Sequence, residues 1–409
     1  MSSERRKFFK KLRDEHYTLL IPDMCPIHFE LLSAVIESYG YHVEVVNPVG
    51  REAKDDGLRT VHNDACYPVI VTCGAFVNAL KSGKYDLNKT AILMSQTGGG
   101  CRASNYISLF RKAFAQEFPM VPVISMNFSG LEKDRSLPTP LSFILRAFAA
   151  VEYGDMIMAM VNQSRPYEKR PGEINEIRDR VIAHLKEQVP HASKFMRMKK
   201  NLRYIADSFS DHDPPETRKP RVAIVGEIFV KYSPYANNHL QDFLEKQGCE
   251  VVYPGLSEFL LYCMYNIMVD HDWYGINSPL YTWADRQLYR YCNRKLRLMN
   301  ELLKEKKFTP FEDFSFIVKE GKRMISSGVK MGEGWVIPAE MLAYSDSGVK
   351  NIVCVQPFGC LPNHIVGKGM IRPLKKLSPD VNVVPLDFDA SSTEVNQENR
   401  LKLMLANAK

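Results

Sequence analysis

The sequence predicts an α/β protein made of two doubly wound parallel-sheet lobes, of the Rossmann or flavodoxin type, that face each other across a cleft. In both halves of the chain, short apolar runs alternate with segments long enough to form helices. This alternation is the pattern of βαβ units, whose strands form a parallel sheet. Between the halves the chain becomes charged, helical and rich in proline, which indicates a connector. A length of 409 residues allows two or three compact units.

The first lobe is expected to span residues 1–164. Its strands are short apolar runs, each ended by a turn signal, and helical periodicity fills the segments between them. Strands are expected at residues 17–21, 43–46, 91–95 and 121–125, and helices at 27–39, 66–80 and 103–118. The most apolar long stretch, 141–161, contains Arg146, Glu152 and Asp155. We therefore expect a buried helix there and not a membrane span.

The connector is expected at residues 165–220, and the second lobe at 221–409 with a helical insertion at about 270–335. Strands are expected at residues 221–227, 250–253, 351–355 and 382–386, and helices at 237–247, 257–268, after residue 364 and at the C-terminus. Ser391 precedes Glu394 by three residues, which predicts a capping box at the start of the last helix.

Composition narrows the function classes. The formal net charge is +7, but basic residues are mostly interleaved with acidic ones. Nucleic-acid binding needs a stripe of cations with stacking or base-reading partners, so we expect none. The basic N-terminus has no apolar core, so we expect no secretory signal and no membrane anchor. Nine cysteines in such a chain suit metal or redox chemistry better than disulfides and indicate the cytoplasm.

Three cysteines lie in tight, loop-like signatures: Cys66 within Asn-Asp-Ala-Cys-Tyr-Pro, Cys101 within Gln-Thr-Gly-Gly-Gly-Cys-Arg, and Cys360 within Gln-Pro-Phe-Gly-Cys-Leu-Pro-Asn-His. Cys101 and Cys360 each follow a predicted buried strand. Both thiols should therefore lie at the carboxyl ends of parallel strands, where open α/β sheets hold their ligands. Thiolates gathered there from distant segments indicate a metal cluster, and an iron–sulfur cluster is the best candidate.

The glycines before Cys101 remove every Cβ from the turn, so the backbone can approach a bulky ligand. Successive amides in such a turn form a nest that suits the electron-rich sulfides of a cluster. A Walker A phosphate loop is excluded, because no Gly-Lys-Ser/Thr follows. A plain glycine turn with an incidental thiol is the alternative. Cys66 lies just before a predicted helix, with Asp64 as the expected N-cap and Asn63 beside it, and a helix N-terminus favours the thiolate.

The other cysteines are weaker candidates for cluster ligands. Cys25 directly follows the first strand, whereas Cys354 lies inside a strand and Cys263 inside a helix, so each of these two is either core or ligand. The remaining three suggest helix interior or incidental packing: Cys73, Cys249 and Cys292. No Cys-x-x-Cys pair occurs, which disfavours a zinc ribbon, a thioredoxin motif or a ferredoxin-type site. His28 and His364 follow cysteine motifs and are expected to support them and not to bind metal.

Seven segments together carry a family resemblance. They are residues 63–68, 96–106, 165–168, 225–227, 332–335, 356–368 and 394–400. In these segments the chain resembles the C-terminal part of the large 2-hydroxyacyl-CoA dehydratase activase-related proteins. That region is itself similar to the dehydratase subunits and to the double-cubane cluster proteins. The resemblance runs from about residue 17 to the C-terminus.

The resemblance implies a low-potential electron-transfer or reductase component. Dehydratase subunits hold a [4Fe–4S] cluster with three cysteines, for which Cys66, Cys101 and Cys360 are the matching residues. The double-cubane relatives hold an [8Fe–9S] cluster, for which Cys25, Cys263 and Cys354 would complete a set of six ligands. This count favours the double cubane over a single cubane.

The resemblance also implies partners. Large activases carry an ATP-binding module of the acetate-kinase/Hsp70 type, and nothing in this sequence resembles it. The chain is therefore expected to need a separate ATP-hydrolysing activase with its own [4Fe–4S] cluster, and a homodimer or a paralogous subunit is a family-level expectation. Two other functions stay open: a 2-hydroxyacyl-CoA dehydratase subunit acting through a ketyl radical, and a non-enzymatic scaffold or regulatory subunit.

Overall fold

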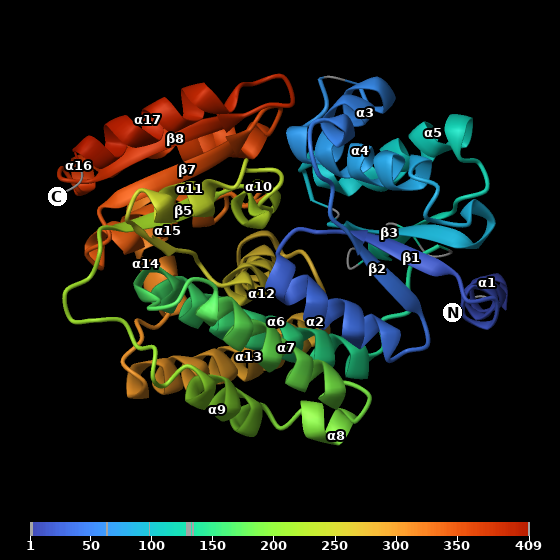
Figure 1. Cartoon of the computed structure of the whole chain (residues 1–409), viewed down its shortest axis with the longest axis horizontal. Helices are drawn as coiled ribbons and strands as arrows, with labels where there is room; N and C mark the ends of the chain where they lie inside the picture. The colour runs from blue at the N-terminus through green and yellow to red at the C-terminus, as the bar shows by residue number, and fades with distance from the viewer. Residues whose placement is uncertain (1–2, 63, 98, 128–131, 133–134, 408–409) are drawn as a thin grey trace.

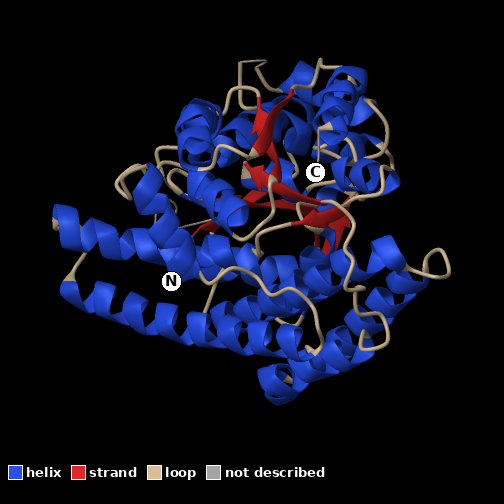
Figure 2. Ribbon diagram, turned by 90° about the vertical axis from the view of Figure 1, so that its left-hand side faces the viewer, coloured by secondary structure: helices blue, strands red, loops and turns tan. Residues whose placement is uncertain are grey.

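The computed structural model describes residues 3–62, 64–97, 99–127, 132 and 135–407 (Figure 1). It contains two four-stranded sheets, and every strand pair in both sheets is parallel. Helices cover the strands of both sheets (Figure 2). The predicted α/β class with two doubly wound lobes is confirmed.

The first sheet has the order β2-β1-β3-β4. Its strands are β1 (Thr18–Pro22), β2 (His42–Val46), β3 (Thr90–Gln96) and β4 (Val123–Asn127). The helices of this half are α1 (Ser3–Asp14), α2 (Pro26–Glu37), α3 (Glu52–Thr60), α4 (Tyr67–Lys81) and α5 (Tyr106–Glu117). Each strand lies within two residues of its predicted position, because buried apolar runs bounded by turn residues leave few alternatives. The short helices α1 and α3 were not predicted.

The second sheet repeats this topology with the order β6-β5-β7-β8. Its strands are β5 (Arg221–Gly226), β6 (Glu250–Val252), β7 (Asn351–Pro357) and β8 (Asn382–Phe388). Its helices are α10 (Ile228–Tyr232), α11 (Leu240–Lys246), α12 (Leu256–Tyr274), α13 (Pro279–Glu305), α14 (Phe314–Met324), α15 (Val336–Asp346), α16 (Ile371–Leu377) and α17 (Glu394–Ala406). In both sheets the chain reverses its direction of winding between the first and third strands. Open α/β sheets bind ligands at this switch point, beyond the carboxyl ends of the strands.

A layer of helices lies beneath both sheets (Figure 1). It includes α6 (Leu141–Ser164), α7 (Glu173–Gln188), α8 (Ala192–Phe195) and α9 (Met198–Ser208). Helix α6 packs against α2 of the first half and against α12 and α13 of the second. Its polar residues Glu152 and Asp155 are fully buried, so α6 is the buried helix that the sequence predicted. Among the helices of the described ranges, none is long and apolar enough to cross a membrane.

The carboxyl edges of the two sheets face each other and are joined by hydrogen bonds. Tyr67 N donates to Phe358 O at 2.9 Å, and Tyr67 Oη donates to Ala236 O at 2.9 Å. Tyr235 Oη donates to Gly50 O at 2.8 Å. The loops that carry the predicted thiols are therefore held together by direct contacts between the lobes.

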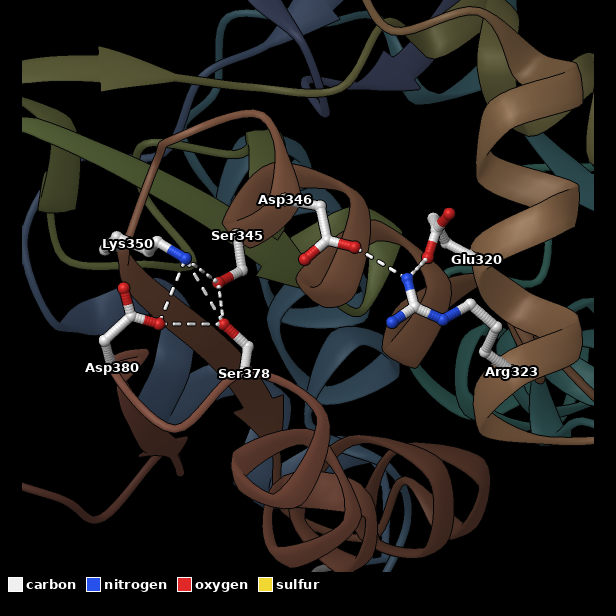
Figure 3. Close-up of polar contacts among 7 residues, drawn as sticks. All are labelled: Glu320, Arg323, Ser345, Asp346, Lys350, Ser378 and Asp380. Atoms are coloured by element: carbon white, nitrogen blue, oxygen red, sulfur yellow. Dashed lines mark hydrogen bonds and ion pairs between the residues drawn. The ribbon is translucent and has the colours of Figure 1, made fainter.

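A separate polar cluster stabilises the amino edge of the second sheet (Figure 3). Lys350, just before β7, lies 3.1 Å from Asp380 Oδ1 and 3.3 Å from the hydroxyl oxygens of Ser345 and Ser378. Next to it, Arg323 of α14 binds Asp346 at the end of α15 at 2.7 Å. These contacts fix the helices and strand starts at the edge opposite the thiols.

Two predicted helix caps are wrong. Helix α4 has Cys66 and not Asp64 as its N-cap, and Asp64 is exposed. Helix α17 has Thr393 as its N-cap without a side-chain bond, while Ser391 Oγ donates to Asp389 Oδ1 at 3.0 Å. In both places the N-cap lies two residues later than the sequence pattern indicated. The main chain therefore reaches its first helical residue later than expected.

Candidate functional site

The loops of Cys66, Cys101 and Cys360 come together between the lobes. A Cβ on Gly359 would lie 3.1 Å from Cys66 Cα, so the Cys360 loop rests directly on the Cys66 loop. A Cβ on Gly332 would lie 3.8 Å from Cys101 Cβ and 3.1 Å from a side-chain carbon of the Cys360 loop. Gly359 and Gly332 have φ angles of +74° and +60°. A residue with a Cβ adopts this left-handed conformation only at an energetic cost, which glycine avoids. Two further residues named in the sequence motifs, Asn63 and Gly98, lie outside the described residues.

A backbone amide of a following helical turn lowers the pKa of each of the three thiols, although neither Cys66 nor Cys101 makes a side-chain cap hydrogen bond. Cys66 is the N-cap of α4, Cys101 precedes a 3-10 helix (Arg102–Asn105), and Cys360 lies just before a π-helix (Asn363–Gly367). The amides belong to Val69, Ala103 and Asn363, respectively. An N–H group aimed at sulfur favours the thiolate, which is the form that binds metal. The sequence predicted this arrangement for Cys66 alone.

Tyr106 completes the surroundings of Cys66. Its Oη lies 2.8 Å from Cys66 Sγ, and both residues are buried. Burial raises the pKa of the Tyr106 hydroxyl, so the group stays protonated and can donate to the sulfur, while a protonated Cys66 thiol can equally donate to the hydroxyl oxygen. Sequence reasoning missed this residue, because nothing in a helical Tyr-Ile-Ser-Leu run indicates which thiol its hydroxyl will meet.

Two buried glutamates lie beside the thiols. Glu227 accepts a hydrogen bond from Val230 N at 2.8 Å, and Glu333 accepts one from Ile228 N at 2.9 Å. Burial, and then the charge of Glu333, raise the pKa of Glu227 to about 8. The sequence segments that contain both glutamates were recognised as motifs, but neither carboxyl was given a role.

Raised pKa values favour the neutral forms of the thiols and glutamates at this site. Burial raises the pKa of all three thiols, and a negative charge on Glu227 raises each of them further. Glu333 acts in the same direction on Cys101 and Cys360. A bound cation would offset these effects and let the thiols ionise as ligands. The donor set of three thiols with amide and hydroxyl donors fits an iron–sulfur cluster, whose sulfurs accept such bonds.

Cys263, on α12, lies on the same side of the site. Its charge interacts with that of Glu333, as do the charges of Cys101 and Cys360. Its side chain is open to solvent, although desolvation by the surrounding protein raises its pKa to about 12. Cys263 is therefore the additional candidate thiol that shares Glu333 as a neighbour with Cys101 and Cys360.

Cys25 and Cys354 lie in other surroundings. Cys25 is the N-cap of α2, and its Sγ lies 2.9 Å from His28 Nδ1. Cys354 is fully buried within β7, where its Sγ is 3.9 Å from Gln356 Nε2. The cysteines expected to be packing residues are buried: Cys73, Cys249 and Cys292. His364 is exposed on the π-helix.

No three His, Cys, Asp or Glu side chains within the described part of the chain are arranged to hold a single metal ion. A cubane cluster requires a wider spacing than one ion does, because each thiolate binds a different iron atom. For a cluster, the relevant features are the convergence of the three thiols and the hydrogen-bond donors near their sulfurs.

In comparisons with known proteins, no protein-family model matches the chain and no curated protein gives a significant match.

Proposed function

We propose that this chain is an iron–sulfur protein that transfers low-potential electrons, a reductase component similar to the 2-hydroxyacyl-CoA dehydratase family. The observation that carries the proposal is the convergence of Cys66, Cys101 and Cys360, contributed by both lobes at the switch points of two parallel sheets. A backbone amide that lowers the pKa of each of the three thiols supports the same conclusion. We also propose a cytoplasmic location, because all nine cysteines are free thiols.

In this function the residues of the chain would act as cluster ligands, as hydrogen-bond donors to the ligand sulfurs, and as glycines that allow close approach of the loops. Cys66, Cys101 and Cys360 would hold the cluster, which supplies one-electron transfer when bound. Tyr106 and the amides would donate to the ligand sulfurs and so tune the potential. The glycines at 332 and 359 let the loops approach closely enough for thiols from both lobes to reach one object.

A [4Fe–4S] cluster on these three cysteines is the form that the thiol arrangement supports best. The double cubane would require Cys25, Cys263 and Cys354 as well. Of these, Cys263 shares Glu333 as a neighbour with Cys101 and Cys360. Cys25 is bonded to His28, and Cys354 is packed inside the second sheet. Either cluster would be reduced by a separate ATP-hydrolysing activase with its own [4Fe–4S] cluster.

The second candidate function is a 2-hydroxyacyl-CoA dehydratase subunit. It is favoured by the number of convergent thiols, since three thiolates leave one iron of a cubane without a cysteine ligand. It would also require an acyl-CoA site and a homologous second subunit, and co-purification with a paralogue would support it.

Metal analysis tests the proposal. Iron and acid-labile sulfide are measured per chain on anaerobically purified protein, together with an EPR spectrum after reduction with dithionite. About four irons per chain would support the single cubane, and about eight would establish the double cubane. ATP-dependent reduction by an activase, without turnover of a 2-hydroxyacyl-CoA, would separate electron transfer from dehydration. Protein that binds no iron after reconstitution would overturn both functions and leave a scaffold or regulatory subunit.

A further inference from the structure

A pocket of about 200 Å³ lies between the lobes, apart from the thiol site. The first lobe lines it with residues 22–23 at the end of β1, residues 46–47 at the end of β2, and one side of α4. The second lobe contributes Phe229 of α10 and residues 233–235 after that helix. No cysteine is among the described residues that line it. The pocket therefore occupies a second place at the carboxyl ends of the strands, where open α/β sheets bind ligands.

Three of the side chains that line the pocket have oxygens that can only accept a further hydrogen bond. Thr72 Oγ1 donates its proton to Pro68 O at 2.8 Å, and Tyr235 Oη donates its proton to Gly50 O at 2.8 Å. Both hydroxyl oxygens are left as acceptors. The third side chain is Asp23, whose carboxylate has acceptors alone. Its Oδ1 is buried and has no hydrogen-bond partner among the described residues.

The carboxyl of Asp23 also lacks a counter-ion. The one charged group of the described chain that acts on its pKa is Glu30, a second acid, whose charge adds to the effect of burial. A partly buried carboxylate next to another acid and without a cation is stabilised by a ligand that brings positive charge.

The basic residues beside the pocket have other partners. His239, an exposed lining residue, lies with its Nδ1 3.3 Å from Asp242 Oδ2. Lys54 Nζ lies 5.1 Å from the centre of the Tyr235 ring. Neither of them forms an ion pair with Asp23 within the described ranges. The positive charge that this carboxylate needs must therefore come from outside the chain.

We propose that this pocket binds a small molecule that carries a primary ammonium group and a short apolar tail. An ammonium group has three donors and no acceptor, which matches the acceptor oxygens of Asp23 and Thr72. The tail would pack against Val71, Ala75 and Phe229, which are buried apolar residues of the lining. A pocket of this volume takes a ligand smaller than a typical drug. Since both lobes form the lining, the ligand would bridge them.

Calorimetric titration of the whole chain with n-butylamine tests this inference, in a buffer that contains no other amine. At pH 8 the probe is an ammonium ion, and the Asp23 carboxyl, with a pKa of about 7, is mostly ionised. n-Butanol is the matched probe, because it keeps the alkyl chain and carries no charge. We expect one butylammonium ion to bind per chain, and n-butanol to bind at least about tenfold more weakly.

Two variants assign the binding to the pocket. Asp23→Asn should weaken n-butylamine by at least about tenfold, since the charge-assisted bond is lost and the shape is kept. Asp179→Asn is the control, because this carboxyl lies on α7 and is 62% exposed; its affinity should equal that of the unsubstituted protein. Thr72→Val, which removes a second acceptor at constant shape, should weaken n-butylamine about threefold or more.

Three results would overturn the inference: no binding of millimolar n-butylamine, equal affinity for the two probes, or equal losses in Asp23→Asn and Asp179→Asn. If Asp23→Asn does not fold, Thr72→Val and the comparison of the two probes decide. The inference does not depend on a cluster. Binding of n-butylamine to a chain that holds no iron would leave it standing while the proposed electron transfer fails.

Discussion

Tyr106 Oη lies 2.8 Å from Cys66 Sγ, although 40 residues separate the two in the chain. The contact joins the start of α5 to the N-cap of α4, the two helices that flank β3. It therefore fixes the position of the Cys66 sulfur relative to the loop that carries Cys101. The hydroxyl also favours the thiolate of Cys66.

Tyr106→Phe should lower the free energy of unfolding by about 1 kcal/mol, because one buried hydrogen bond is lost while the ring is kept. If a cluster is bound, its reduction potential should become more negative, since a donor to a ligand sulfur is removed. Urea unfolding and a redox titration measure the two effects. Tyr153→Phe is the matched control: its buried hydroxyl bonds Phe195 O, so stability should fall while the potential stays unchanged.

Substitution of each convergent cysteine by serine should reduce the bound iron by more than half. Cys66→Ser and Cys360→Ser remove thiols that face the shared site, whereas Cys73→Ser and Cys249→Ser remove buried thiols that are expected to be packing residues. Iron per chain after anaerobic reconstitution is the measurement. Equal losses in Cys73→Ser and Cys66→Ser would contradict a site built on the convergent thiols.

Gly359→Ala should destabilise the chain by about 2 to 3 kcal/mol. The residue has φ of +74°, and the new Cβ would lie 3.1 Å from Cys66 Cα. The left-handed backbone alone costs about 1 kcal/mol, and the close contact adds the rest. Gly83→Ala isolates the first cost, because φ is +73° there and nothing lies within 4 Å of the added Cβ. Urea midpoints that fall by the same amount in both variants would rule out a tight contact between the Cys360 and Cys66 loops.

The free energy of unfolding should fall as pH rises from about 4 to about 7, in part because the buried carboxyl of Asp23 ionises in this range. Burial, and then the charge of Glu30, raise the pKa of its carboxyl from 3.8 to about 7. In this window the folded state binds a proton that the unfolded state has released, so ionisation favours unfolding. Asp23→Asn should therefore gain stability relative to the unsubstituted protein as pH rises through this window. Thermal unfolding of both proteins across this pH range is the measurement. An Asp23→Asn curve that runs parallel to that of the unsubstituted protein would show that Asp23 ionises alike in the folded and unfolded chain.

The sequence determined the class of fold and its repeating units. Apolar runs such as those of β3 and β7 are long enough for one strand, are bounded by turn residues, and alternate with helical periods, so local physics is sufficient to place them. The carboxyl-edge location of Cys101 and Cys360 followed from the same pattern, because the end of a parallel strand is a topological position. Helix caps were less secure, as Asp64 and Ser391 demonstrate, since a cap depends on one or two residues of turn geometry.

Only the tertiary structure decided which of these residues meet. Cys66, Tyr106, Glu227 and Glu333 come from four separate segments, and no local preference specifies the docking of one lobe on the other. Tertiary packing also brings Cys25 together with His28, and His28 together with Asp155, which lies 127 residues later in the sequence. The same packing encloses Cys354 in the second sheet. A sequence pattern reports burial and periodicity along one element. The meeting of side chains depends on the packing of elements that are distant in the chain, and that packing brings together the loops of Cys66, Cys101 and Cys360.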